Sequence, residues 1–346
     1  MTSTGHGVYL SVDGGYSGTR ALLVDGCGTA LGYGRGGNAN HERQGLNRAV
    51  RNIATAVEHA CGAAGISVGS IDTAYFALAG DDVQDDHIML TGALATAWPA
   101  LSFALSNDVW ASLRAGATGE IGVAVNCGSG TGTVGRNNRG DTFIIPDNGY
   151  KLGSSGGGGQ IATDAVRAVV RAWDGRGEPT VLTAPVLAIT RQPDVQALYL
   201  AIYQGRVPKA RLHRLTPAVL RASAEGDAVA TGILRRIGAE MGVAAAAVAR
   251  RLGMDGDAFP FVLTGGTIRT LRGALADAAV TRMRRDAPHC VPTLPLLQPV
   301  AGGALLALDE AGVPVLHDHY AWLAAQGYGW HPEETFDGWQ VEQERR

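Results

Sequence analysis

The sequence predicts an α/β protein in which one α/β unit occurs twice. Three observations support this. Apolar runs typical of strands alternate with amphipathic helical segments over the first 120 residues. The same order starts again near Ile121. Both halves open with a strand that runs into a turn of glycines and small hydroxyl residues. Strand–helix alternation favours a mainly parallel sheet, here entered through an antiparallel meander, and a repeated layout indicates duplication.

Composition indicates a globular chain with no strong electrostatic field. Its 346 residues are enough for two domains, 46% are hydrophobic and 18% are charged, and the net charge is −3. A net charge this small gives no reason to expect a nucleic acid or an anionic membrane as partner. The chain shows no secretory signal pattern and no apolar run of ~20 residues, which predicts a cytoplasmic location.

The four cysteines are far apart in the sequence, at Cys27, Cys61, Cys127 and Cys290. None of them belongs to a CxxC pair. This spacing argues against a disulfide scaffold and against a zinc or iron–sulfur site built within one chain.

The first turn lies in the stretch VYLSVDGGYSGTR, residues 8–20. An apolar strand, Val8–Val12, ends at an acid, and the chain turns on two glycines into a second strand, Thr19–Val24. Glycines allow close approach to the backbone, and neighbouring amides can bind an anion such as a phosphate chain. An ordinary β-hairpin would show the same Asp-Gly signal. The candidate phosphate-binding residues are Asp13, Gly14, Gly15, Ser17, Thr19 and Arg20.

Strands and helices alternate after this hairpin. The apolar positions of the first helical segment recur with the 3.6-residue period, and each later strand is followed by polar residues and a helix. The expected elements are a strand near 29–34, a helix at 42–64, a strand at 73–78, a helix at 85–97, a strand at 101–106 and a helix from 109.

The second half repeats this opening. A strand at 121–126 leads into the turn Cys127–Gly132 and a partner strand at 133–136. When this second stretch is aligned with residues 8–20, Asn126 takes the place of Asp13. A third strand is expected at 142–145, and a helix at 161–173 follows the glycine-rich segment 152–160.

Segment 175–227 breaks the alternation, because five prolines separate its short helical stretches. We interpret it as a helical insertion. Its basic residues are expected to form a solvated face, as runs of charge usually do. These residues are Arg206, Lys209, Arg211, His213 and Arg214. A helix at 228–252, a strand at 261–264 ending in Gly265-Gly266-Thr267, a further helix and the apolar segment 296–308 complete the chain.

Five motifs stand in order along the chain: DGGYSGTR, SNDVWASL, NCGSGTGTV, FVLTGGTIRT and VAGGALLAL. Together they resemble the actin/hexokinase/Hsp70 ATPase superfamily, and within it the BadF/BadG/BcrA/BcrD family with its N-acetylglucosamine kinases. The resemblance covers residues 8 to about 308. It implies two ribonuclease-H-like (actin-like ATPase) domains with a cleft between them. The first would comprise 1–112 with the tail 316–346, and the second 113–315 with the helical insertion at about 175–227.

The resemblance also implies ATP and Mg²⁺ as cofactors. Both turns would bind phosphates, and Asp13 would hold the metal ion through a water molecule. Gly265 and Gly266 would lie beneath the adenosine. In the second turn the phosphate-binding residues would be Gly128, Ser129, Gly130 and Thr131.

Asp108 matches the position of the family's catalytic base. A sugar hydroxyl must lose its proton as it attacks the γ-phosphorus, and a carboxylate within hydrogen-bond reach can accept that proton. A helix start at Val109 would favour the charged form of this acid. The same position also suits a simple helix N-cap, a role that aspartate often fills.

Other residues match loops that contact the sugar in the family. Asn40 and His41 match an Asn-His pair, although polar residues are common in any loop. Asp81 and Asp82 follow a strand end at Gly80, where a helix start would also favour acids. The set implied to contact the substrate is Asn40, His41, Gly80, Asp81, Asp108, Gly132, Ser154 and Ser155.

One segment departs from the family pattern. Family members usually carry Gly-Asp-Glu-Gly-Ser before the helix that is expected here from Ile161, whereas this chain has Gly153-Ser154-Ser155-Gly156-Gly157. In the related sugar kinases that Asp helps to hold the sugar. Serine supplies a hydroxyl but no charge, so N-acetylglucosamine itself is not fixed as the substrate.

The resemblance therefore implies an ATP-dependent sugar kinase for an amino sugar or an N-acetylhexosamine, with a cleft that closes on its substrates. Two alternatives stay open. An ATPase activator of a radical dehydratase would need cysteines to bridge a [4Fe–4S] cluster, and here Cys127 replaces a glycine of the second turn. A non-catalytic sugar or nucleotide sensor would not need Asp108. The sequence also leaves a homodimer open.

Overall fold

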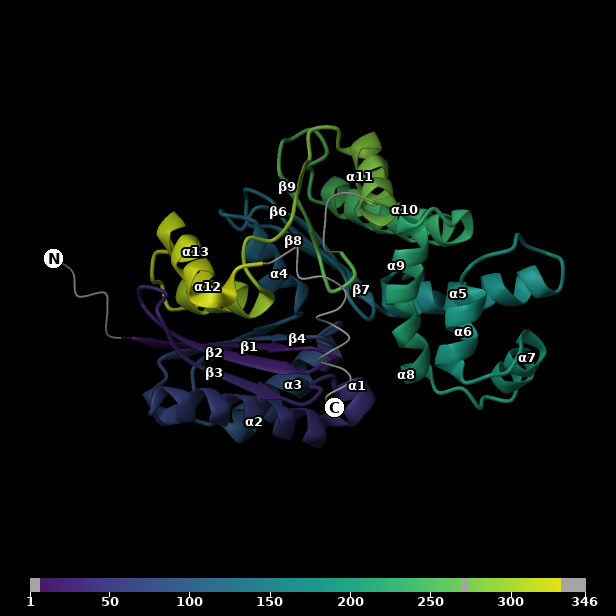
Figure 1. The fold of residues 1–346 in the computed structure, drawn as a ribbon. Coiled ribbons are helices and arrows are strands. Elements are labelled where there is room, and N and C mark those ends of the chain that lie inside the picture. Colours follow the sequence, from purple (N-terminus) through teal and green to yellow (C-terminus); the bar gives the residue numbers. More distant parts are fainter. Residues whose placement is uncertain (1–6, 269–272, 331–346) are drawn as a thin grey trace.

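The computed structural model describes residues 7–268 and 273–330. In these residues the chain forms two five-stranded sheets, each flanked by helices (Figure 1). The first sheet has the order β3-β2-β1-β4-β5, and the second has the order β10-β9-β6-β7-β8. Read from the meander, the second order is β8-β7-β6-β9-β10, which is the first order repeated. This repetition confirms the predicted duplicated α/β fold.

The strands follow the predicted positions closely, and each predicted strand agrees with the structure to within two residues at either end. In the first sheet they are β1 (Val8–Gly14), β2 (Thr19–Asp25), β3 (Ala30–Gly36), β4 (Thr73–Leu78) and β5 (Phe103–Ser106). In the second they are β6 (Gly122–Cys127), β7 (Thr131–Arg136), β8 (Thr142–Ile145), β9 (Pro260–Thr264) and β10 (Val291–Thr293). The sequence did not predict β10, because three residues that include a proline carry no strand pattern.

Both sheets are built in the same way. Antiparallel pairing joins β1 to β2 and β2 to β3, and β4 then pairs in parallel with β1 on its other side. In the second sheet, β6, β7 and β8 form the antiparallel meander, and β9 pairs in parallel with β6. The two hairpins β1–β2 and β6–β7 therefore occupy equivalent places, and each turn lies at the end of a central strand.

Helices cover both faces of the first sheet (Figure 1). One face packs α2 (Leu46–Ala64) and α3 (Gln84–Ala97), and the other packs α12 (Pro299–Glu310) and α13 (His317–Leu323). The predicted helix 42–64 is wrong in one respect. A short helix α1 (His41–Gln44) ends before Gly45, whose φ of 76° and ψ of 149° interrupt the helical backbone. Glycine adopts such a positive φ without the strain that a Cβ would add.

Two helices cross between the halves of the molecule. Helix α4 (Val109–Gly116) follows β5 but buries Val109 and Leu113 against the second sheet. Helix α12 comes late in the chain but packs on the first sheet. The two helices touch at Gly302, where a Cβ would collide with the carbonyl of Ala111. The proposed domain boundaries at 112 and 315 stay a prediction, since these crossing helices tie each half to the other.

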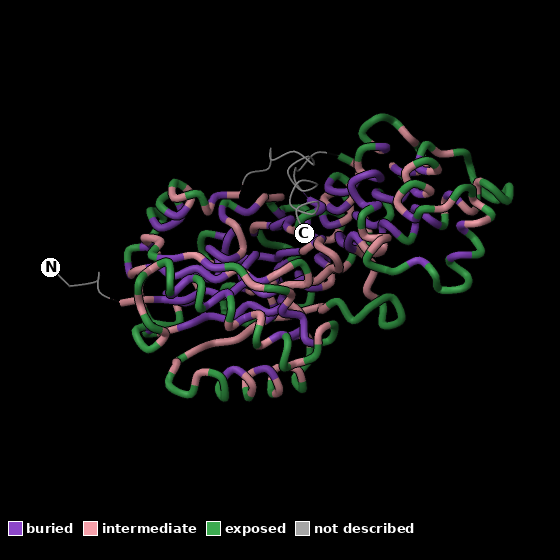
Figure 2. Tube along the Cα trace, turned by 60° about the horizontal axis from the view of Figure 1, so that its bottom comes forward, coloured by how far each residue is buried: buried purple, intermediate pink, exposed green. Residues whose placement is uncertain are grey.

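The second half is largely helical outside its sheet, and a buried core runs through both halves (Figure 2). Helix α5 begins four residues earlier than predicted, inside the glycine run. The helices of the second half are α5 (Gly157–Trp173), α6 (Thr183–Thr190), α7 (Val195–Tyr203), α8 (Lys209–Leu212), α9 (Thr216–Ala224), α10 (Ala228–Arg251) and α11 (Ala274–Asp286). Short helical turns lie at Val68–Ser70, Tyr150–Leu152, His213–Leu215 and Ala324–Tyr328. Among the described residues, none of the helices combines the length and apolar character that a membrane span requires.

Candidate active site

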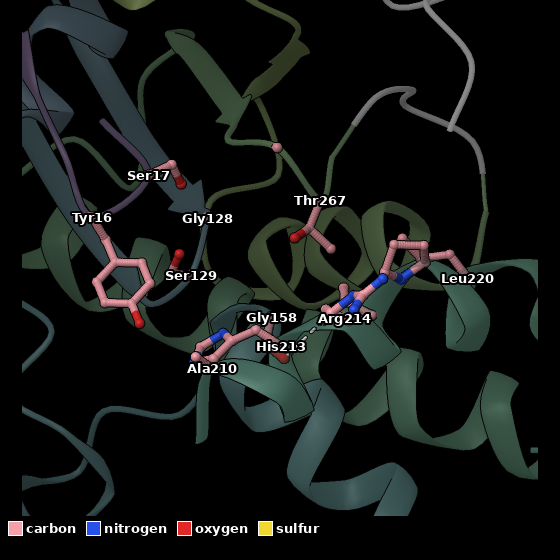
Figure 3. Close-up of a pocket in the computed structure, with 13 residues that line it drawn as sticks. Tyr16, Ser17, Gly128, Ser129, Gly158, Ala210, His213, Arg214, Leu220 and Thr267 are labelled. Carbon is pink, nitrogen blue, oxygen red and sulfur yellow. Dashed lines mark hydrogen bonds between the residues drawn. The ribbon is translucent and has the colours of Figure 1, made fainter. Parts of the chain in front are cut away.

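The two hairpin turns open onto one cavity of about 320 Å³ (Figure 3). Tyr16 and Ser17 reach it from the first turn, and Gly128 and Ser129 reach it from the second. The cavity therefore lies between the two halves of the chain. This is the arrangement that the two candidate phosphate loops require.

The first turn is closed by its own backbone. The N–H of Gly15 donates to the carbonyl of Gly18 over 3.0 Å, and the N–H of Ala39 donates to Gly15 over 3.2 Å. The hydroxyl of Thr19 donates to the carbonyl of Gly37 over 2.6 Å, so in this structure it braces the turn against the next loop. These hydrogen bonds fix the backbone conformation of the turn where it borders the cavity.

Asp13 lies at the end of β1, buried beside this turn. Its carboxylate is 3.6 Å from the guanidinium of Arg20, which is its register partner on β2. Burial raises the pKa of Asp13, and Arg20 partly offsets that rise. A buried acid that is only partly compensated by one half-exposed arginine suits a site that attracts a cation.

The second turn is braced by a helix. Within it, the N–H of Gly128 donates to the carbonyl of Gly130 over 3.0 Å. The first turn of α5 then caps it, because Gly158 donates to Gly128 O over 2.8 Å and Gly159 donates to Ser129 O over 3.0 Å. These bonds explain why α5 starts inside the glycine run, and a Cβ on its first residue, Gly157, would come within 2.5 Å of the Gly130 backbone.

The predicted glycines serve two different purposes. A Cβ on Gly14, Gly130 or Gly265 would clash with neighbouring protein atoms, so close packing accounts for these three. A Cβ on Gly128 or Gly266 would meet no atom closer than 3.6 Å, and both residues line the cavity. Packing does not explain why they are glycines. The absence of side chains there keeps the cavity open for a ligand that approaches the backbone closely.

The far wall of the cavity comes from the helical insertion (Figure 3). The prediction of a solvated basic face is wrong for His213, which is half-buried, and both His213 and Arg214 line the cavity. Arg214 is exposed, and no hydrogen bond or ion pair joins its guanidinium to another residue of the described chain. Sequence reasoning missed this wall, because nothing in the local pattern of 208–220 shows that it folds back onto the hairpins. Its lining residues are Ala210, His213, Arg214, Thr216, Pro217 and Leu220.

Two rings and one guanidinium lie against one another where the insertion meets the first turn. The ring of Tyr16 lies 5.8 Å from that of His213, and the guanidinium of Arg43 lies 5.4 Å from the Tyr16 ring centre. Burial lowers the pKa of His213, and the charge of Arg43 lowers it further. A neutral imidazole can stack on Tyr16 without repelling Arg43, so this contact joins the insertion to the first turn.

Asp108 precedes α4 near the junction of the two halves. Asp108 stands at the N-terminal end of this helix, but its side chain makes no capping hydrogen bond. Asn107 makes one instead, since its Oδ1 accepts from the N–H of Val109 over 3.1 Å. Burial and then the negative charges of Asp13 and Asp82 raise the pKa of Asp108 to about 7. The carboxylate is therefore poised between its two protonation states at neutral pH.

Asp82 extends this group of acids. Its carboxylate accepts a hydrogen bond from the Asn107 amide over 2.7 Å. Burial raises its pKa to about 7, and the charges of Glu42, Asp147 and other nearby carboxylates raise it as well. Acids from separate parts of the chain thus converge beside Asp108.

The predicted sugar-contacting residues of the first half lie together. Gly80 has a φ of 98°, and a Cβ there would approach both Asn40 and His41 to 3.1 Å. Asn40 caps α1 by accepting from the N–H of Arg43 over 3.1 Å, and Asp81 contacts His87 over 3.1 Å. The structure therefore brings the Asn-His pair and the end of β4 to one place.

His41 is the most informative of these residues. Its Nε2 contacts Asp86 over 3.1 Å, whereas its buried Nδ1 has no hydrogen-bond partner among the residues that the structure describes. A buried polar atom without a partner is costly unless something else satisfies it. A ligand hydroxyl at this position would do so.

The three substrate residues predicted in the second half differ in their surroundings. Gly132 packs beside Val109, since a Cβ on it would come to 3.0 Å from the Val109 side chain. The hydroxyl of Ser154 is occupied within its own loop, where it donates to Pro146 O over 3.0 Å and accepts from Asn148 N over 3.2 Å. Ser155 is half-buried. The sugar roles of these residues stay predictions.

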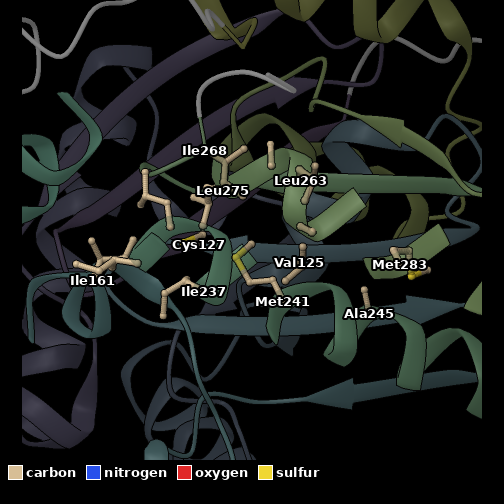
Figure 4. Packing of buried hydrophobic residues seen from close by; sticks show 14 of the residues in the cluster. Val125, Cys127, Ile161, Ile237, Met241, Ala245, Leu263, Ile268, Leu275 and Met283 are labelled. Carbon is tan, nitrogen blue, oxygen red and sulfur yellow. The ribbon is translucent and has the colours of Figure 1, made fainter. Parts of the chain in front are cut away.

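Cys127 lies in the core of the second half (Figure 4). It is fully buried among Val125, Ile161 and Met241, and burial raises the pKa of its thiol to about 11. In the described ranges, no three His, Cys, Asp or Glu side chains gather in a way that would hold a metal ion. A protonated thiol pointing into a hydrophobic core is not placed to bridge a cluster.

Comparison with known proteins identifies the family. Residues 10–307 match the model of the BadF/BadG/BcrA/BcrD ATPase family, which covers most of the chain. The chain belongs to the BadF/BadG/BcrA/BcrD ATPase family. The predicted resemblance is thereby confirmed, and the match spans both hairpin turns, Asp108 and the wall of the cavity.

Individual members of this and related families support the assignment. The N-acetyl-D-glucosamine kinase of Dictyostelium discoideum is 25% identical over 317 residues, which cover 88% of this chain and 98% of that protein. The N-acetylmuramic acid/N-acetylglucosamine kinase of Clostridium acetobutylicum is 27% identical over 193 residues, or 56% of this chain and 63% of that protein.

Solved structures agree. A crystal structure from Chromobacterium violaceum, provisionally described as an N-acetylglucosamine kinase, has a TM-score of 0.66 and 27% identity over 87% of this chain and 98% of its own. A ROK family glucokinase from Streptomyces griseus, solved with glucose and AMPPNP, has a TM-score of 0.57 at 17% identity over 88% of this chain and all of its own. The second likeness shows the fold alone.

Proposed function

We propose that this family member is an ATP-dependent sugar kinase that phosphorylates an amino sugar or an N-acetylhexosamine, with Asp108 as general base. The observation that carries the proposal is the state of Asp108. Its carboxylate does not cap α4, it lies where the two halves meet, and its pKa is raised to about 7. A general base works best when its pKa is close to the operating pH.

The cavity fits a nucleotide with its phosphates at the hairpins. Gly128 and Gly266 leave open space over their backbones, Ser129 lies on the second turn, and Arg214 adds a positive charge on the opposite wall. Asp13 is a buried carboxylate placed at the first turn to hold a water of the metal. Mg²⁺, when bound with the nucleotide, would neutralise charge on the phosphates.

The proposed chemistry is a direct phosphoryl transfer. The acceptor hydroxyl forms a bond to the γ-phosphorus, the bond between that phosphorus and the β,γ-bridging oxygen breaks, and ADP leaves. Asp108 takes the proton of the hydroxyl. Positioning and charge stabilisation account for most of the rate in such reactions, and this chain supplies them through two fixed turns.

The acceptor would lie against Asn40, His41 and Asp81, beside Asp108. The unpartnered Nδ1 of His41 supports this, because a sugar hydroxyl can satisfy it. The two curated relatives act on N-acetylglucosamine, and one also acts on N-acetylmuramic acid. The serines at 154 and 155 leave the choice among amino sugars and N-acetylhexosamines to experiment.

The test combines an acceptor screen with one variant. The parent protein should release ADP in a coupled assay with at least one member of a panel of hexoses, hexosamines and N-acetylated hexosamines. Asp108→Asn should keep nucleotide affinity and lower kcat by ~10²–10⁴, the usual contribution of a positioned base. An Asn variant nearly as active as the parent would contradict the role of Asp108, and a parent inactive on every sugar would contradict the kinase assignment.

Stability gives an independent check on the same variant. A carboxyl with a raised folded-state pKa binds its proton more tightly when folded, so its stabilising contribution is lost as pH rises from about 4 toward about 7. Asn cannot ionise. Asp108→Asn should therefore exceed the parent in melting temperature by a margin that is small near pH 5 and larger near pH 8. A fold damaged by the substitution would show a lower melting temperature at both values.

A further inference from the structure

Asp147 lies on the loop between β8 and α5, and the proposed mechanism gives it no role. Its Oδ2 accepts a hydrogen bond from the N–H of Thr131 over 3.0 Å. A Cβ on Gly130 would collide with this carboxylate. The side chain therefore lies directly against the second hairpin turn, although it stays exposed on its outer side.

The loop that carries Asp147 is closed around it. Ser154 donates to the carbonyl of Pro146 and accepts from the N–H of Asn148, which are the two neighbours of Asp147 in the chain. Asp147 Oδ1 also accepts from the N–H of Gly149 over 3.4 Å. The serine at 154 thus supports the loop, and the loop presents a carboxylate.

Two observations connect this carboxylate with the acceptor end of the site. The first is contact: Thr131, which binds Asp147, is followed by Gly132, and Gly132 packs beside Val109, the neighbour of Asp108. The second is electrostatic: the charge of Asp147 contributes to the raised pKa of Asp82, which Asn107 holds next to Asp108. The charge of Asp147, on the second half, thus acts on an acid of the first half that lies next to Asp108.

We propose that Asp147 is an acceptor-binding residue, through which the second half of the chain holds hydroxyl or amide groups of the sugar. This inference rests on the proposed kinase function. An ionised carboxylate has about four acceptor positions. Thr131 and Gly149 use two of them, which leaves acceptor capacity for a sugar. Asp147 thereby supplies the charge that Ser154 and Ser155 lack.

The test measures the KM for the sugar and the KM for ATP in Asp147→Asn and in the parent protein. The acceptors are N-acetylglucosamine and the best acceptor of the panel. Asn keeps an oxygen for the Thr131 N–H, so the second turn should stay in place. The KM for the sugar should rise roughly 10-fold, because hydrogen bonds to a charged acceptor are the stronger ones. The KM for ATP should not rise, because Asn keeps the turn in place and only removes a negative charge beside it.

Asp141→Asn is the matched control. Asp141 lies in the turn before β8, at the opposite end of that strand from Asp147, and it pairs with Asn137 and Arg139. Its substitution should leave both constants unchanged. An unchanged sugar KM in Asp147→Asn, or an equal rise of both constants, would overturn this inference while the kinase assignment stands. An inactive parent protein would instead overturn the proposed function itself.

Discussion

The two hairpin turns occupy equivalent places in duplicated sheets, yet they differ in charge and in support. The first ends β1 with an acid, Asp13, paired across the strands with Arg20. The second ends β6 with the neutral Asn126, paired with Gly132. The first turn is braced by a loop, through Gly37 and Ala39, whereas the second is braced by the N-terminal turn of α5.

This difference shows how duplication can produce a site with two unlike sides. One turn places a buried carboxylate where a cation would be held, and the other presents backbone and a serine fixed by a helix start. A phosphate chain between them would meet opposite electrostatic environments. The positive end of the α5 dipole lies behind the second turn, which favours an anion on that side. The following predictions test whether the asymmetry has this function.

The largest effect is expected from removing the acid of the first turn. Asp13→Asn makes both turns end in an amide, and turnover should fall by ~10²–10³, as it does when a group that stabilises transition-state charge is removed. Steady-state kcat with titrated Mg²⁺ measures this. The loss should not be rescued by more nucleotide. Wild-type turnover in Asp13→Asn would mean that the asymmetry between the turns is without catalytic meaning.

The reverse change sharpens the same comparison. Asn126→Asp gives both turns an acid, in a place where Gly265 packs against the Asn126 side chain. The added charge should raise the KM for ATP, since it lies on the side that would face the phosphates. An unchanged KM for ATP would show that the second turn does not approach the phosphates.

A smaller effect is expected at the wall of the cavity. Arg214→Gln removes a cation that lines the cavity with no partner in the described chain, and the KM for ATP should rise about 10-fold while the KM for the sugar stays constant. Arg211→Gln is the control, because Arg211 belongs to the same basic cluster but does not line the cavity. Equal effects from both variants would indicate general electrostatic attraction rather than a contact at position 214.

The smallest effect is a shift in pH dependence. If Asp108 must be ionised to act, kcat/KM should fall as pH drops below about 7. The charge of Asp82 raises the pKa of Asp108, so Asp82→Asn should move this acid limb to lower pH. Asp85→Asn is the control, since Asp85 is exposed on the same segment and is not among the charges that act on Asp108. If the acid limb of the kcat/KM profile does not move in Asp82→Asn, that limb does not report the ionisation of Asp108.

The sequence by itself determined the order of elements and the places where strands end. Strands have a short period and a strong apolar signal, so β1 to β9 could be located to within two residues. The acids and glycines at strand ends, Asp13, Asp108 and Gly128 among them, were found for the same reason. Elements with little local signal were missed or misjudged, as the three-residue β10 and the break at Gly45 show.

Only the tertiary structure decided which of these residues meet. The sequence could not tell that Gly265 is small for packing while Gly266 borders a cavity, because the difference depends on atoms more than 100 residues away. Nor could it show that Asn107 caps α4 and so releases Asp108, or that the insertion brings Arg214 to the hairpins. Local periodicity fixes the backbone, but contacts between distant segments depend on how complete surfaces pack, and no short stretch of sequence encodes them.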